Sequence, residues 1–101
     1  MKILALEAES PGIEKGRFKP FLKEEALKIW ELYQNGTLRE LYFSAEADSA
    51  ILILECSSIQ EAESVLSVLP LVRENLISFQ LIALKPYPGF KRLFEEEAFK
   101  A

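Results

Sequence analysis

The chain of 101 residues contains no histidine and a single cysteine, Cys56. Without histidine it cannot assemble a Ser/His/Asp or Cys/His triad, nor the usual ligand sets for zinc or non-haem iron. One cysteine cannot form an internal disulfide bond, and a lone thiol suits a reducing compartment. Cys56 lies on the apolar face of a predicted strand, which favours a small buried side chain over a nucleophile. We therefore expect chemistry, if any, without a metal or other cofactor.

Long apolar runs and phosphate-binding loops are also missing. No apolar run approaches the roughly 20 residues that cross a bilayer, and MKILALEAES at the N-terminus has too short an apolar core for a secretory signal. The four glycines are isolated, so there is no glycine-rich phosphate loop. A net charge of −4, with twelve basic residues spread along the chain, argues against nucleic acid. These absences indicate a cytoplasmic protein that binds neither membranes nor nucleic acids.

The residues that are present describe a folded domain. Half of them are hydrophobic and 28% are charged, which is typical of a soluble globular protein. A chain of this length forms one core, and no linker divides it. We expect a single domain over residues 1–101, of which residues 86–101 form a C-terminal tail.

Hydrophobic periodicity predicts six elements in the order strand, helix, strand, strand, helix, strand. The strands are expected at 2–7, as a hairpin within 37–55, and at 76–84; the helices are expected at 20–34 and between Ser58 and Pro70. Asn35 and Gly36 are typical of a helix end, whereas Ser58 and Glu61 have the spacing of a capping box. The order is the split βαβ pattern of ferredoxin-like domains. The predicted fold is therefore α+β, with two helices on one face of a four-stranded antiparallel sheet.

The hairpin predicts which side chains share a face of the sheet. If the turn centres on Glu46 and Ala47, residues whose numbers sum to 93 lie opposite each other, and side chains alternate between faces. One face is almost wholly apolar and should pack against the helices: Arg39, Leu41, Phe43, Ala50, Leu52, Leu54 and Cys56. The other face combines aliphatic side chains with carboxylates and a phenol: Leu38, Glu40, Tyr42, Ile51, Ile53 and Glu55.

This second face needs a cover that no helix of the chain supplies. From the first strand we expect Ile3, Ala5 and Glu7 on it. The last strand adds one of two sets, either Ser78, Gln80 and Ile82 or Ile77, Phe79 and Leu81. A large apolar sheet face left bare is a liability, and two copies packed sheet to sheet would cover it. The alternative is a loosely packed sheet whose carboxylates form a solvated rim.

Packing of two copies would enclose a space for a small ligand, lined by aliphatic side chains and a few acids. Glu7, Tyr42 and Glu55 are the candidate ligand-binding residues, and Gln80 joins them under the first alternative for the last strand. Like-charged acids in a partly dry space raise one another's pKa, which leaves one of them poised as a base.

The C-terminal tail is unusually aromatic for a solvated end. It carries Tyr87, Phe90 and Phe94, while Pro86 and Pro88 limit its flexibility. We expect the tail to pack on a partner subunit or over the mouth of the cavity. The acidic end, EEEAFKA, is expected to be either helix or disorder.

Three features resemble the muconolactone isomerase family of dimeric α+β barrels: GTLRELY at 36–42, SSIQEAESVLSVLPL at 57–71, and Pro86 after the last strand. The resemblance spans residues 36–86. It implies a homodimer, which could assemble into larger rings, and a cofactor-free isomerase that moves a proton around a small unsaturated lactone.

The resemblance also implies roles for individual residues. Glu25 stands where the family has a helix glutamate implicated in proton transfer, and Arg39 matches an arginine that could hold a carboxylate bidentately. Isomerisation needs such an acid/base group and a cation or donor for the developing enolate. Ala26 stands where the family has a basic residue and Glu40 where it has a histidine. Glu40 is therefore a third candidate catalytic residue.

Plainer interpretations of the same residues stay open. Glu25 could be a solvated helix acid, and Arg39 could extend its aliphatic part from the helix-facing layer and pair with an acid. Two classes of function follow. One is a cofactor-free isomerase acting on a small lactone or carboxylated substrate. The other is a non-enzymatic barrel that binds a small apolar ligand or only assembles.

Overall fold

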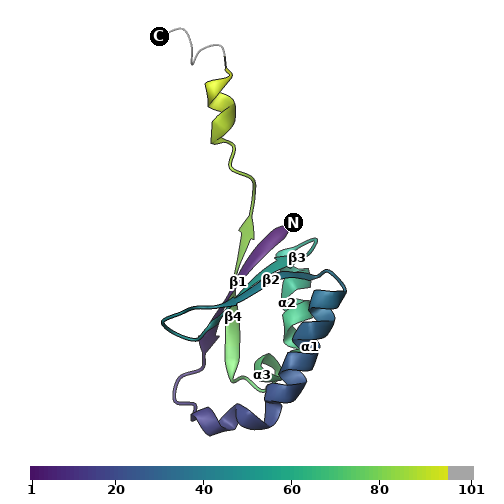
Figure 1. The fold of residues 1–101 in the computed structure, drawn as a ribbon, viewed down its shortest axis with the longest axis vertical. Helices are drawn as coiled ribbons and strands as arrows, with labels where there is room; N and C mark the ends of the chain where they lie inside the picture. Colours follow the sequence, from purple (N-terminus) through teal and green to yellow (C-terminus); the bar gives the residue numbers. More distant parts are fainter. Residues whose placement is uncertain (96–101) are drawn as a thin grey trace.

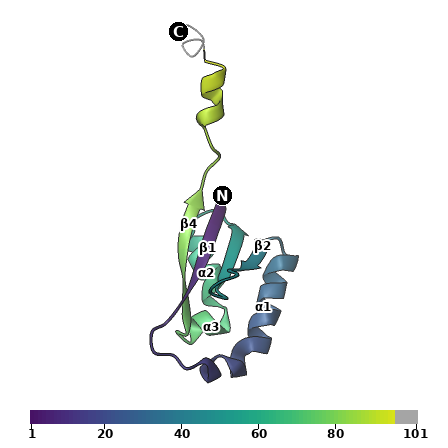
Figure 2. The same cartoon turned by 60° about the vertical axis from the view of Figure 1, so that its left-hand side comes forward.

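A computed structural model describes residues 1–95 of the chain (Figure 1). The elements follow in the order β1 (Lys2–Glu9), η1 (Lys15–Arg17), η2 (Lys19–Phe21), α1 (Leu22–Gln34), β2 (Leu38–Phe43), β3 (Ala50–Glu55), α2 (Ile59–Ser67), α3 (Pro70–Arg73), β4 (Ile77–Leu84) and η3 (Gly89–Leu93). The strands form an antiparallel sheet in the order β2-β3-β1-β4, and the α-helices lie on one of its faces (Figure 2). The predicted ferredoxin-like α+β fold is confirmed, with the short α3 as an addition.

The core lies between the sheet and the helices. Strand pairing sets Ile3 opposite Leu54 and Ala5 opposite Leu52, and all four side chains are buried. Helix α2 adds Ala62 and Leu66 to the same cluster. Burying each large aliphatic side chain contributes roughly 1.5–3 kcal/mol relative to leaving it exposed. This cluster is therefore the main source of the domain's stability.

The hairpin of β2 and β3 has the predicted register over most of its length. Tyr42 pairs with Ile51, Phe43 with Ala50, Leu41 with Leu52 and Glu40 with Ile53, all as expected. A β-bulge between Leu38 and Glu40 then shifts the pairing by one residue. Leu38 comes to lie opposite Leu54 and is only 1% exposed. Its expected place on the second face is therefore wrong, because the bulged Arg39 takes up one position of the strand.

The prediction of which β1 side chains point to which face of the sheet is also wrong. Leu4 pairs with Ile53 and Leu6 with Ile51, so Leu4 and Leu6 occupy the second face, while Ile3, Ala5 and Glu7 face the helices. The run from Ile3 to Leu6 is apolar at every position, so it contains no alternation from which the phase could be chosen.

The structure decides between the two alternatives for β4. Gln80 pairs with Leu6 and Ile82 with Leu4, which places Ser78, Gln80 and Ile82 on the second face. Ile77, Phe79 and Leu81 therefore face the helices, where Phe79 and Leu81 pack against the core. We call the second face the open face, defined by Leu4, Leu6, Ile51, Ile53 and Ile82.

The helices begin and end near the predicted signals. The Ser58 hydroxyl accepts a hydrogen bond from the backbone N–H of Glu61 at 3.0 Å, and the Glu61 carboxylate accepts one from the N–H of Ser57 at 2.8 Å. At the other helix, Asn35 caps the end of α1 and Gly36 takes the left-handed conformation, with φ of +84°. No helix within residues 1–95 has both the length and the apolar character to cross a bilayer.

The segment after β4 extends away from the rest of the domain (Figures 1 and 2). We call residues 85–95 the arm; it contains η3 and the predicted aromatic tail residues. Within it the Tyr87 and Phe90 rings pack edge to face, with centroids 5.0 Å apart. The acidic end for which helix or disorder is expected, residues 95–101, lies outside the described residues except for Glu95.

Candidate functional site

A cavity of about 820 Å³ lies between α1 and the helix-facing side of the sheet, near the β2 edge. Its volume is in the range of sites that bind small molecules. Most of its wall is apolar or aromatic, with a few charged groups: Glu7, Leu22, Glu25, Ala26, Ile29, Trp30, Tyr33, Arg39, Glu40, Leu41, Tyr42, Phe43, Ala50, Leu52, Leu71, Ile77 and Phe79. The cavity is on the helix side of the sheet and not on the open face.

Helix α1 forms one wall of the cavity, and only its partly buried Ile29 and Leu32 pack against the core. None of its thirteen residues is buried, although Leu22, Trp30 and Tyr33 are large and apolar. The alanines at positions 26 and 50 leave space where longer side chains would meet. The apolar stripe of this helix therefore lines a cavity: Leu22, Ala26, Ile29 and Tyr33.

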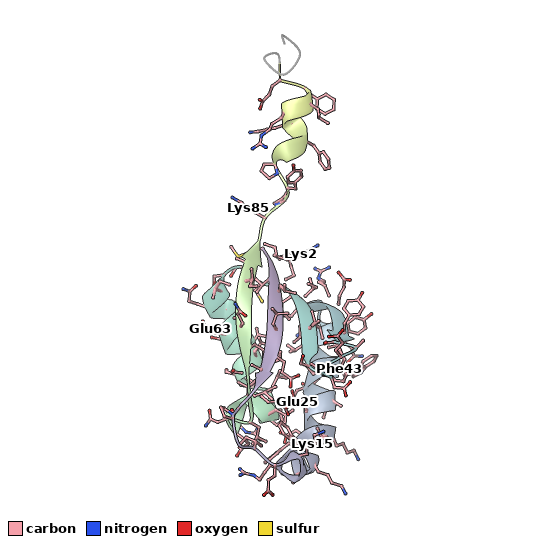
Figure 3. All side chains as sticks on the ribbon, turned by 90° about the vertical axis from the view of Figure 1, so that its left-hand side faces the viewer. Lys2, Lys15, Glu25, Phe43, Glu63 and Lys85 are labelled. Carbon is pink, nitrogen blue, oxygen red and sulfur yellow. The ribbon has the colours of Figure 1, made fainter. Side chains whose placement is uncertain are left out.

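Glu25 lies in the first turn of α1 (Figure 3) and lines this cavity. Its Oε1 accepts a hydrogen bond from the backbone N–H of Leu71 at 3.0 Å, and the side chain is half-buried. Burial raises the pKa of Glu25 above its ordinary value, the Leu71 hydrogen bond opposes this rise, and the Glu7 carboxylate adds to it. The fixed position and raised pKa are those of a usable acid/base group.

Glu7 enters the same cavity from β1. Its Oε1 accepts a hydrogen bond from the backbone N–H of Ala50 at 2.7 Å, which ties the end of β1 to the start of β3. The site therefore contains two carboxylates from different elements, each held by one backbone donor. The predicted position of Glu7 on the open face is wrong: Glu7 lines the cavity on the helix-facing side, together with Glu25.

The remaining charged groups belong to β2 and lie at the exposed rim of the cavity. The Tyr42 hydroxyl donates a hydrogen bond to Glu40 at 2.9 Å. That bond, together with the charge of Glu40, raises the pKa of Tyr42. Arg39, the bulged residue, supplies the only cationic side chain among the residues of the wall. A ligand that enters past β2 would therefore meet a guanidinium, a phenol and a carboxylate.

Two predicted ligand-binding residues lie elsewhere. Glu55 accepts a hydrogen bond from the N-terminal ammonium of Met1 at 2.6 Å, which lowers the pKa of Glu55. Gln80 is exposed on the open face opposite Leu6. Neither residue lines the cavity.

Sequence reasoning did not assign the aromatic wall to a site. Trp30 and Tyr33 lie with ring centroids 6.0 Å apart, and Phe43 is exposed at the end of β2 (Figure 3). Helix α1 has more apolar residues than one core-facing stripe can bury, and this excess is the sequence signal that could have indicated the aromatic wall. The backbone N–H of Leu71 has no sequence signal, since every residue except proline has such a group.

The thiol is separate from this site. Cys56 is buried in the core cluster, and burial raises the pKa of its thiol, as expected for a structural side chain. No three acidic or thiol side chains converge as metal ligands would within residues 1–95.

The fold has counterparts among solved structures. The crystal structure of muconolactone isomerase matches with a TM-score of 0.71 and 18% identity, covering 88% of this chain and 93% of that one. The chain has the muconolactone isomerase fold. The resemblance predicted from the sequence is thereby confirmed for the fold.

A second structure with the muconolactone isomerase fold is 5-chloro-2-hydroxyhydroquinone dehydrochlorinase (TftG) from Burkholderia phenoliruptrix AC1100, in complex with 2,5-dihydroxybenzoquinone. It matches with a TM-score of 0.63 and 16% identity, covering 86% of this chain and 96% of that one. Comparison of the sequence with protein-family models, and with curated proteins, finds no match.

Proposed function

We propose that the chain is a cofactor-free acid/base enzyme that shifts a proton on a small, planar, oxygenated ring such as a lactone. The observation that carries this proposal is the setting of Glu25, a half-buried carboxylate of raised pKa in an apolar cavity. Oε1 of Glu25 accepts a hydrogen bond from the backbone N–H of Leu71, whereas Oε2 of Glu25 accepts none from residues 1–95. Oε2 is therefore free to take a proton from a bound ligand.

The chemistry needs two further contributions from the cavity. Glu25 removes a proton from a ring carbon next to a carbonyl, and negative charge then develops on the carbonyl oxygen. Arg39, with the Tyr42 phenol as a donor, stabilises that oxygen or holds a substrate carboxylate at the rim. Glu25 returns the same proton to another ring carbon, so the net reaction is an isomerisation. A raised pKa favours both transfers because it lies nearer the working pH.

The names of the structural neighbours support this ligand class. One is named for the isomerisation of muconolactone, and the other was solved with a dihydroxybenzoquinone. Both ligands are small and oxygenated. In this chain the aromatic wall of Trp30, Tyr33 and Phe43 offers flat surfaces to a ring of that kind.

On this proposal the enzyme works as a homodimer in the cytoplasm. The open face supports the dimer, because its aliphatic side chains have no cover from the helices. The buried, unpaired thiol of Cys56 is in keeping with a reducing compartment. Light scattering at low micromolar concentration should find a dimer, and a folded monomer would contradict the homodimer.

The test is turnover of muconolactone and related small lactones by the full chain and by Glu25→Gln. Glutamine can still accept the Leu71 hydrogen bond but cannot carry the proton, so kcat should fall by about 10²- to 10⁴-fold with KM little changed. Glu24→Gln is the matched control, since Glu24 is an exposed acid of the same turn that does not line the cavity. Full activity of Glu25→Gln would exclude the proposed role.

A second candidate function is binding without turnover, favoured by the predominantly apolar wall of the cavity. Trp30 is the sole tryptophan of the chain and lines the cavity, so its fluorescence should report ligand entry. Lactones that change Trp30 fluorescence but are recovered unaltered would support a binding protein. In that case Ala26→Leu, which fills part of the cavity, should abolish the fluorescence change.

A further inference from the structure

We propose that Glu7 is a ligand-binding residue that accepts a hydrogen bond from a hydroxyl group of the ligand. The cavity would then select neutral hydroxylated rings over rings that carry a carboxylate at their inner end. This inference rests on the proposed function and narrows its substrate class. Its test measures binding alone, so it can fail while proton transfer by Glu25 stands.

Glu7 lies where strands β1 and β3 part. The pairing of β1 with β3 ends at Leu6 and Ile51, whereas its pairing with β4 continues to Glu9. Just beyond that end, Oε1 of Glu7 accepts a hydrogen bond from the backbone N–H of Ala50 at 2.7 Å. This bond fixes the carboxylate in the wall of the cavity, while Oε2 of Glu7 accepts no hydrogen bond from residues 1–95.

Glu25 has the same arrangement on helix α1. Its Oε1 accepts the hydrogen bond from the N–H of Leu71, and its Oε2 has no donor among residues 1–95. The two carboxylates line one cavity and affect each other, since the charge of Glu7 contributes to the raised pKa of Glu25. A ligand that displaces water from these oxygens must replace its hydrogen bonds, because an acceptor buried without a donor is costly.

The cavity wall is divided by polarity. Apart from Glu7 and Glu25, the lining residues that are not exposed are all apolar: Ile29, Ala50, Leu52, Leu71, Ile77 and Phe79. The side chains of the wall that can donate a hydrogen bond belong to exposed residues: Trp30, Tyr33, Arg39 and Tyr42. The inner wall therefore offers acceptors, and the rim offers donors.

This division sets the orientation of a ligand. A hydroxyl group suits the inner end, next to Glu7, whereas a carbonyl or carboxylate oxygen suits the rim, next to Arg39 and Tyr42. A carboxylate at the inner end would meet two groups of its own charge in a poorly solvated space, where like charges repel strongly. A ring with hydroxyl groups inside and a carbonyl group at the rim satisfies both ends.

An ammonium group is a less suitable donor than a hydroxyl group. Arg39 places a positive charge at the rim, past which a cationic ligand would have to enter. The raised pKa of Glu25 also reduces the negative charge available to compensate a buried cation. A neutral hydroxyl group costs less to transfer into an apolar wall than an ammonium group.

The test compares ligands with one ring and different substituents at the same two positions: resorcinol, its dimethyl ether, isophthalate and m-xylylenediamine. None of them is a lactone, so binding is measured without turnover. Titrations followed by the backbone amide signals of Ala50 and Leu71 in NMR spectra give each dissociation constant. We expect resorcinol to bind at least about 10-fold more tightly than its dimethyl ether, which cannot donate a hydrogen bond.

Glu7→Gln should remove most of that preference. The glutamine carbonyl still accepts the Ala50 hydrogen bond, but an NH₂ group replaces the free oxygen and cannot accept a proton from the ligand. Glu9→Gln is the matched control, because Glu9 is an exposed acid of the same strand that does not line the cavity. A role for Glu7 in strand pairing alone predicts that neither variant changes the preference.

The proposal is overturned if resorcinol and its dimethyl ether bind equally to the parent, or if Glu7→Gln retains the preference. Tighter binding of isophthalate or m-xylylenediamine than of resorcinol would also overturn it. Should Glu7→Gln fail to fold, the carboxyl ¹³C signal of Glu7 in the parent decides. It should shift on addition of resorcinol and not of the dimethyl ether, while that of Glu9 stays constant; equal shifts with both ligands would contradict the role of Glu7.

Discussion

Helices α1 and α2 lie on the same face of the sheet, yet α1 contributes to the core only the partly buried Ile29 and Leu32. Helix α2 has nine residues and buries Ala62 and Leu66, whereas α1 has thirteen residues and buries none. Both sequences have an amphipathic pattern. The two helices lie over opposite edges of the sheet: α2 contacts β4 and α3, while α1 contacts β2. An apolar stripe on a helix thus identifies a surface to be covered, by the protein or by a ligand.

The polar groups follow the same division. The space between α2 and the sheet is filled by aliphatic side chains. The space between α1 and the sheet contains Glu7 and Glu25, and each carboxylate accepts one hydrogen bond from a backbone N–H. A half-buried carboxylate is costly unless it is hydrogen-bonded, so these two donors allow acids to stay in an apolar wall. The loosely packed half of the molecule is where the chemistry can be placed.

The largest expected effect is on the free energy of unfolding, when one leucine on each helix is replaced by alanine. Leu66 is 3% exposed and Leu22 is 50% exposed. Leu66→Ala should lower the free energy of unfolding by about 2–5 kcal/mol, as for other buried leucines. Leu22→Ala should lower it by less than about 1 kcal/mol, because the leucine lines a space that is already open. Urea unfolding measures both; equal losses would mean that α1 is packed as tightly as α2.

A smaller effect should appear in the pH dependence of stability. Because the pKa of Glu25 is raised in the folded protein above 4.5, the folded state holds a proton that the unfolded state has already lost. The free energy of unfolding therefore falls as pH rises from the ordinary carboxyl range through the raised pKa. Glu25→Gln removes this fall, so the variant should match the parent in acid and exceed it at neutral pH.

At neutral pH the free energy of unfolding of Glu25→Gln should exceed that of the parent by less than about 1 kcal/mol. Glu25 is only half-buried, and the Leu71 hydrogen bond offsets part of the free energy lost by burying its charge. In a domain of this size that is a rise in Tm of at most roughly 4–8 °C. Thermal unfolding over a pH series measures it, with Glu63→Gln, an exposed acid of α2, as the control. Parallel profiles for the parent and Glu25→Gln would show that the carboxylate is fully solvated.

The smallest effect concerns the rim, which is exposed. Glu40 accepts the Tyr42 hydrogen bond and repels the phenolate, so Glu40→Gln should lower the pKa of Tyr42 toward its ordinary value while leaving stability unchanged. Ultraviolet titration of the tyrosines detects the change, and Tyr42→Phe identifies which part of the curve belongs to this residue. A titration curve that Glu40→Gln does not alter would show that the pair does not persist in solution.

Much of the fold could be predicted because its signals are local. Asn35 with Gly36, and Ser58 with Glu61, delimit the helices, and the position of the turn set four strand pairs correctly. The bulge at Arg39 could not be predicted, because an extra residue in a strand leaves no mark in the alternation that follows it. The phase of β1 failed for a related reason, since Leu4 and Leu6 are as apolar as Ile3.

The site was predictable only in part. Glu25 and Arg39 were suggested by the family resemblance, and five of the seven candidate residues do line one cavity: Glu7, Glu25, Arg39, Glu40 and Tyr42. The cavity's position between α1 and the sheet was not predictable, because the stripe of a helix looks the same whether it meets a core or an empty space. Glu55 and Gln80 were placed by strand phase alone, and phase does not report which face is hollow.

The bulge between Leu38 and Glu40 has a further consequence for aggregation. Strand β2 is at the edge of the sheet, so one side of its backbone is unpaired and open to another chain, and it carries Leu41, Tyr42 and Phe43 in succession. Exposed apolar edge strands of this kind readily add to one another. A bulge bends and twists such an edge, and the charges of Arg39 and Glu40 lie at that position. The inserted residue that gives the cavity its guanidinium therefore also protects the chain against growth into an extended sheet.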